Sequence, residues 1–189
     1  MKKNLTVFLF ALLCTSLGHA QLSLSPSGAE FSKNVELIVR DYPDKFINLQ
    51  KELISTATNY VVFSSSIKIP GATDCVIHHY SADFNSSANW QATMYEGDDA
   101  EMAKKIYRNT CKSIQHTKLS LTGYSGIGFT GNMVNVTNDI SFAESVYQLN
   151  LKDILYDDFY AEVELVNSGP FTWVVHLNFF NKKKDEERY

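Results

Sequence analysis

Two runs of alternating side chains near the C-terminal end constrain the fold of this chain more than any other feature. Residues 159–165 and 171–179 each place an apolar side chain at every second position, and Ser168, Gly169 and Pro170 separate the two runs. A period of two residues is typical of a β-strand with one buried face. A turn between two such runs predicts a β-hairpin with one face in the core and the other in solvent.

Further strands are predicted at residues 60–69, 75–80, 90–96 and 141–151. In the first of these, Val61, Phe63, Ile67 and Ile69 share a face, and Pro70-Gly71 ends the strand. In the third, Trp90, Ala92 and Met94 are expected to face inward.

Three segments carry apolar residues at helical spacing. The first begins at a capping box formed by Ser27 and Glu30, and the second starts near Pro43, which is tolerated in a first turn. Asp98, supported by Glu101, is expected to cap the third. Their predicted buried stripes are Phe31, Val35 and Ile38; then Phe46, Leu49, Leu53 and Ile54; then Ala103, Ile106, Tyr107, Thr110, Cys111 and Ile114.

This order of elements predicts an α+β fold with a mainly antiparallel sheet packed against N-terminal and central helices. The apolar fraction of 44% and the aromatic fraction of 13% are sufficient for one core, so residues 21–181 are expected to form a single domain. The pattern is weakest between residues 118 and 156. The two halves share an order of helix followed by strands, which raises the hypothesis of a duplication.

The N-terminal residues 1–20 predict a cleavable signal peptide. Lys2 and Lys3 precede an almost wholly apolar run at residues 5–13, and Gly18-His19-Ala20 favours cleavage before Gln21. The run is too short to span a membrane. Export to a bacterial periplasm or beyond is therefore expected, and a eukaryotic secretory signal is left open. Lipidation at Cys14 is disfavoured because the bulky Leu13 precedes it.

The charge of the chain argues against nucleic acid and anionic membrane surfaces as partners. The formal net charge is −4, and loss of Lys2 and Lys3 would make it −6. The basic run at residues 182–184 is followed at once by three acids, so residues 182–189 are expected to be a solvated charged tail.

Cys75 and Cys111 are the two cysteines that would remain after export. An even number in an oxidising compartment predicts a disulfide between them. The alternative is two separately buried thiols. A catalytic dithiol is disfavoured because the Cys-x-x-Cys spacing is absent.

The first candidate site is His176 with Glu162 or Glu164 on the polar face of the C-terminal hairpin. A carboxylate beside an imidazole is suited to acid–base chemistry. A three-residue loop would place Glu162 opposite His176, and a five-residue loop would place Tyr160 there. The same cross-strand pair is also ordinary surface stabilisation.

Three weaker candidates follow. A glycine-punctuated stretch at residues 123–131 forms either a mobile loop or a bulged edge strand, and Tyr124 and Phe129 on it are candidate ligand-binding side chains. His78 and His79 are neighbours that point to opposite faces of a strand, so no metal site is predicted there. The Asp157-Asp158 pair lacks a calcium-binding loop around it and more simply starts a strand.

The sequence favours an exported, non-enzymatic binding or accessory module without a cofactor. Its expected ligand is an apolar small molecule held between helix and sheet, or a protein partner at a sheet face. Two alternatives stay open: a hydrolase of an envelope or extracellular substrate that uses His176, and a secreted inhibitor or immunity-type protein.

Overall fold

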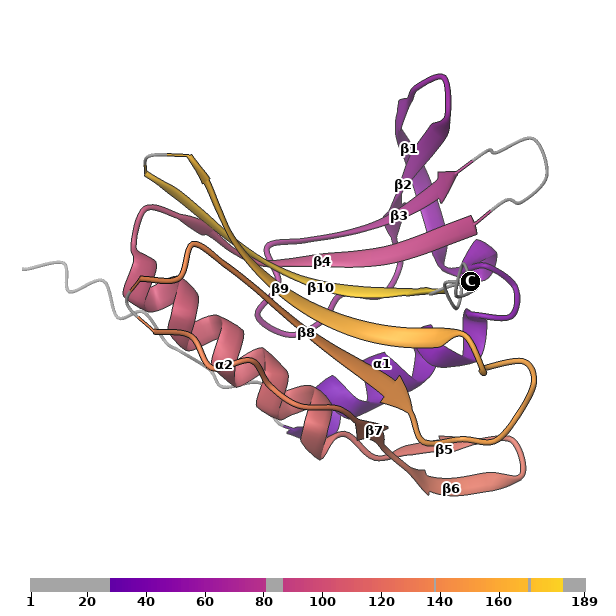
Figure 1. Cartoon of the computed structure of the whole chain (residues 1–189). Helices are drawn as coiled ribbons and strands as arrows, with labels where there is room; N and C mark the ends of the chain where they lie inside the picture. The colour runs from indigo at the N-terminus through magenta and orange to yellow at the C-terminus, as the bar shows by residue number, and fades with distance from the viewer. Residues whose placement is uncertain (1–27, 81–86, 138, 170, 182–189) are drawn as a thin grey trace, which may run out of the picture.

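The computed structural model describes residues 28–80, 87–137, 139–169 and 171–181. Within these residues the chain forms an α+β fold dominated by one antiparallel sheet (Figure 1). The predicted signal peptide (1–20), Ser27 of the predicted capping box and the charged tail (182–189) lie outside the described residues. No helix in the described segments is long and apolar enough to cross a membrane.

The eight-stranded main sheet consists of two four-stranded meanders, each preceded by a helix. Helix α1 (Gly28–Asp41) precedes β1 (Gln50–Thr56), β2 (Tyr60–Ser65), β3 (Asp74–Tyr80) and β4 (Ser87–Gly97). Helix α2 (Ala100–His116) precedes β7 (Phe129–Thr130), β8 (Phe142–Leu149), β9 (Phe159–Gly169) and β10 (Thr172–Asn181). The spatial order is β1-β2-β3-β4-β10-β9-β8-β7, so the last strand of each half lies at the centre. A separate hairpin, β5 (Leu119–Leu121) with β6 (Tyr124–Ile127), follows α2.

Both helices lie on the same side of the sheet (Figure 1), which we call the inner face. Helix α2 packs on β4, β8, β9 and β10, and its predicted stripe is buried except for Ile106, which packs at the core margin. The inner-face residues of the central strands are fully buried, among them Trp90, Phe159, Leu177 and Phe179. The predicted inward positions on β4, β9 and β10 are confirmed, apart from the exposed Phe171, which precedes β10, and the half-buried Trp173.

The second predicted helix is wrong. After Asp41 the chain makes a tight turn, forms one 3-10 turn at Ile47–Leu49 and continues as strand β1, where Leu53 and Ile54 are exposed. Lys45 and Phe46 have φ of 56° and 60°, in the left-handed region, which ends any helix there. Phe46, Leu49 and Leu53 are three and four positions apart, which favours a helix in a short window, but pairing with β2 decided the outcome.

Three smaller predictions also need correction. Strand β2 ends at Ser65, and Val62 is more deeply buried than Val61 or Phe63, because the strand stands at the sheet margin beyond the helices. Phe171 lies in the hairpin turn and is 79% exposed, so the alternation starts after it. The cap of α2 is Asp99, whose carboxylate accepts a hydrogen bond from the Met102 amide at 2.9 Å.

Replacing the cap tests the helix start. We expect Asp99→Ala to lower the free energy of unfolding by about 1 kcal/mol, because the Met102 amide loses its acceptor. Asp98→Ala removes the same charge one residue earlier and should change the free energy by less than about 0.5 kcal/mol. Urea unfolding of both variants measures the difference. Equal losses would mean that the cap position is misassigned.

Candidate functional site

The C-terminal hairpin brings His176 opposite Glu164. Gly169 pairs with Thr172, and a register shift between Thr172 and Trp173 then places Asn167 opposite Trp173 and Glu164 opposite His176, so neither predicted register is formed. The His176 Nδ1 atom lies 3.5 Å from Glu164 Oε2, and both side chains are about one-quarter exposed (25% and 27%). The shorter connection and the register shift together move every facing pair along the strands, which is why Glu162 does not face the imidazole.

Glu162 instead belongs to a row of hydrogen-bonded side chains that crosses the middle of the sheet. The Gln91 amide on β4 donates to Asn178 Oδ1 on β10 at 2.9 Å. The Asn178 amide in turn donates to Glu162 Oε1 on β9 at 3.0 Å. The row lies on the face opposite the helices, which we call the outer face, and no described helix packs on it (Figure 1).

The electrostatics of this row are unfavourable for a charged carboxylate. Burial raises the pKa of Glu162, and repulsion from Glu144 and Glu164 raises it further. The hydrogen bond from Asn178 partly offsets these effects. Glu144 and Glu164 are directly opposite each other across β8 and β9, a like-charge arrangement that destabilises a sheet surface. Proton uptake by Glu162 is therefore easier in the folded chain than in the unfolded chain.

Aromatic side chains occupy the outer face beside this row. The ring of His78 stacks on Tyr80, with centroids 6.1 Å apart, and lies 6.4 Å from Tyr60. On the other side of β4, Phe180 on β10 and Tyr160 on β9 are directly opposite each other. Five ring-bearing side chains thus gather at one end of the outer face.

Two buried polar atoms within this region lack partners. They are His78 Nε2 and Asn89 Oδ1, which belong to directly opposed residues of β3 and β4. Burial lowers the pKa of His78, so its neutral form is favoured. Buried polar groups without partners are costly and are few in native structures.

His79 points to the inner face, as predicted for a neighbour of His78. Its ring packs edge-on against Phe63 and contacts the Gln50 side-chain amide, so the two histidines do not share a site. Among the described residues no group of three potential metal ligands is present.

The predicted Cys75–Cys111 disulfide is not formed, and both residues are buried free thiols. Cys75 lies on β3, whereas Cys111 on α2 faces Ser145 and Tyr147 of β8. Strands β3 and β8 are four strand spacings apart, about 19 Å at about 4.8 Å per spacing. A disulfide needs Cα atoms within about 7 Å. The sequence alone did not reveal that three strands lie between β3, which carries Cys75, and β8, which Cys111 faces.

Of the two candidate ligand-binding side chains on this stretch, Tyr124 lies at a pocket. This pocket, of about 330 Å³, also includes Arg40, Leu121, Leu155 and Tyr156. Phe129 is instead buried in the core near Phe159, because β7 pairs with β8 as an edge strand. The alternative of an edge strand for this stretch is therefore the better description of residues 129 and 130.

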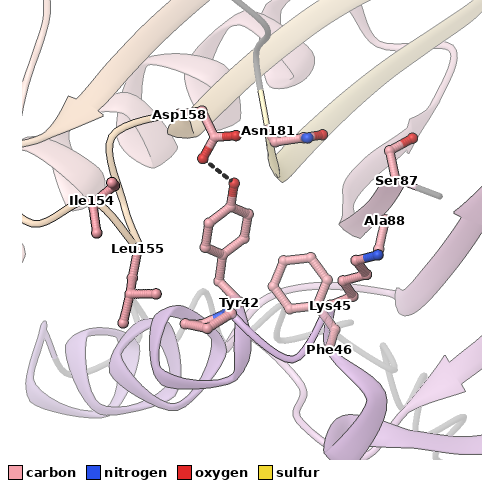
Figure 2. A pocket seen from close by; sticks show the side chains of 10 residues that line it. Tyr42, Lys45, Phe46, Ser87, Ala88, Ile154, Leu155, Asp158 and Asn181 are labelled. Atoms are coloured by element: carbon pink, nitrogen blue, oxygen red, sulfur yellow. Dashed lines mark hydrogen bonds between the residues drawn. The ribbon is translucent and has the colours of Figure 1, made fainter. Parts of the chain in front are cut away.

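Asp158 of the predicted acidic pair accepts a hydrogen bond from the Tyr42 hydroxyl at 2.7 Å. This bond lies at the wall of another pocket, between the end of α1 and the starts of β4 and β9 (Figure 2). Sequence reasoning missed Tyr42, as it missed the outer-face residues Gln91 and Asn178. The polar Asn178, placed between the apolar Leu177 and Phe179 and nearly fully buried, was the one local signal of the outer-face row.

Comparisons with known proteins add no assignment: the chain matches no family model, no curated protein and no solved structure.

Alkylation tests the state of the cysteines. We expect iodoacetamide to modify both Cys75 and Cys111 in the denatured protein without prior reduction, because both are thiols. In the native protein both should react slowly at pH 8, since burial raises the pKa of Cys75 to about 11 and also raises that of Cys111. Peptide mass spectrometry measures the extent of alkylation at each cysteine. A disulfide-linked peptide would contradict this expectation.

Glu162→Gln tests the electrostatics of the outer-face row. The raised pKa means that the free energy of unfolding of the native sequence falls as pH rises above about 4.3, the ordinary value for glutamate. The glutamine keeps an acceptor for Asn178 and has no charge, so the variant should gain stability relative to the native sequence between pH 4.5 and 7. Urea unfolding across this pH range measures the difference in free energy of unfolding between the variant and the native sequence. Parallel pH profiles for the variant and the native sequence would contradict the expectation, and Glu52→Gln on the exposed β1 is the matched control.

Proposed function

We propose that this chain is an exported binding module and that it recognises a protein partner through the outer face of its main sheet. Export rests on the signal-like features of residues 1–20. The observation that carries the binding proposal is the cluster of Tyr60, His78, Tyr80, Tyr160 and Phe180 on a face that no described helix covers.

The composition of this face resembles that of protein interfaces. Interface centres are enriched in aromatic residues, with charged side chains nearer the rim. Here the rings adjoin the ordered row of Gln91, Asn178 and Glu162, and Glu144 and Glu164 lie farther along β8 and β9. Side chains already fixed by mutual hydrogen bonds lose little conformational entropy on binding, which favours recognition.

A small apolar ligand between helix and sheet has less support. The side chains that fill this layer, among them Trp90, Tyr107 and Phe159, are fully buried and packed against one another. A secreted inhibitor or immunity-type protein is one form of the proposed function, since it also acts through a protein interface.

A hydrolase is the second candidate, favoured by the approach of His176 to Glu164. The hydroxyl residue in register with His176 on its other side is Thr93. No hydrogen bond joins Thr93 to the imidazole in the described structure, and an activated nucleophile needs a base within hydrogen-bond reach. The binding proposal therefore has the stronger support.

Site-specific photo-crosslinking tests the proposed function. A benzophenone amino acid in place of Tyr80 on the outer face should yield a discrete protein adduct in the cells that export the chain. The matched control replaces Leu37 on α1, because the two side chains are similarly exposed (38% and 37%). We expect at least about tenfold more adduct from position 80, the ratio that a 1.4 kcal/mol preference would give. Equal adducts from the two positions, or none from position 80, would reject the outer face as the interface.

A further inference from the structure

A pocket of about 290 Å³ lies apart from the outer-face cluster, where the end of α1 meets β4, β9 and β10 (Figure 2). Segments from both halves of the chain form it, which is typical of ligand sites between structural units. Its volume is near the lower end of the range for small-molecule pockets. The lining residues are Tyr42, Pro43, Lys45, Phe46, Ser87, Ala88, Ile154, Leu155, Asp158 and Asn181.

Among its described lining residues, the pocket combines an apolar wall with one cation, Lys45, and one anion, Asp158. Pro43, Ile154 and Leu155 supply the apolar surface, and Ile154 is 86% exposed. Figure 2 shows Asp158 at the hydroxyl end of Tyr42 and Lys45 beyond the neighbouring Phe46 ring, and both charged residues line the pocket. Since the Tyr42 hydroxyl bonds to only one Asp158 oxygen, Oδ1, the other carboxylate oxygen remains an additional acceptor.

The backbone that presents Lys45 is strained. Lys45 and the bulky Phe46 both have positive φ, a conformation that side chains of this kind rarely adopt. Asp41 holds the turn in place through three hydrogen bonds. Its backbone carbonyl accepts from the Phe46 backbone N–H at 3.0 Å. Its carboxylate accepts from the Asn48 side-chain amide at 2.6 Å and from the Asn48 backbone N–H at 3.1 Å. Strain that the surrounding structure maintains is found preferentially at functional sites.

We propose that this pocket binds a small zwitterion with an apolar body, of the size of a dipeptide of apolar residues. The ligand ammonium pairs with Asp158 and the ligand carboxylate pairs with Lys45. Both pairs are charge-assisted hydrogen bonds, the stronger class of such bonds. The apolar side chains of the ligand cover Pro43, Ile154 and Leu155, which removes exposed hydrocarbon from water.

Calorimetric titration with leucyl-leucine tests the proposal. The native protein should bind this dipeptide, and it should bind the N-acetyl and the C-terminal amide analogues at least about tenfold more weakly, because each analogue lacks one charge. In Asp158→Asn the amide oxygen still accepts from Tyr42, but the charge is lost. This variant should therefore bind leucyl-leucine and its N-acetyl analogue with equal affinity. Lys45→Gln should bind leucyl-leucine and its C-terminal amide analogue with equal affinity. Asp157→Asn is the matched control and should behave as the native protein does.

Three results would overturn the proposal. The first is that the native protein does not bind leucyl-leucine at millimolar concentration. The second is that the native protein binds all three ligands with equal affinity. The third is that acetylation and amidation of the ligand weaken binding equally in both variants. Circular dichroism establishes that each variant folds. If a variant does not fold, the ligand series on the native protein still decides. The outcome is independent of the outer face, because no residue is shared between the two sites.

Discussion

The pairing of β4 with β10 is the interaction on which the rest of the structure depends. Each half of the chain supplies one of these strands as the last strand of its meander, and the ladder between them joins the two halves into one sheet. Trp90 and Phe179 pack across this junction with centroids 5.7 Å apart. Helix α2 packs on both strands, so one helix buries the junction from the inner side. The shared order of helix and four strands supports the hypothesis of a duplicated unit.

The same junction creates both candidate sites. Gln91 belongs to the first half and Asn178 to the second, and they meet only because β4 and β10 are neighbours. The pocket beside Tyr42 likewise combines the end of α1 with Asp158 and Asn181 from the second half. Neither site exists within one half alone, which explains why short motifs in the sequence did not reveal them.

Where local pattern and tertiary contact agreed, the sequence predictions were accurate. Strands β3, β4, β9 and β10 and helix α2 were expected close to their observed positions, since each has a clear period and a turn or cap at its end. The predictions failed where two local solutions were similar in energy. Asp98 and Asp99 are both good caps, and residues 46–54 fit a helix until the left-handed Lys45 and Phe46 exclude one.

The sequence by itself determined helices α1 and α2 and most of the long strands, together with the buried side of many of them, because side-chain periodicity is a local property. It did not determine β1, which was predicted as a helix. Only the tertiary structure decided which strands are neighbours. It therefore decided that Cys75 and Cys111 are far apart, that Glu164 rather than Glu162 faces His176, and that Tyr42 bonds to Asp158. Strand order is set by contacts between residues distant in the chain, and the register of this hairpin by the length of its turn and the register shift beside it. Neither leaves a periodic signal in the sequence.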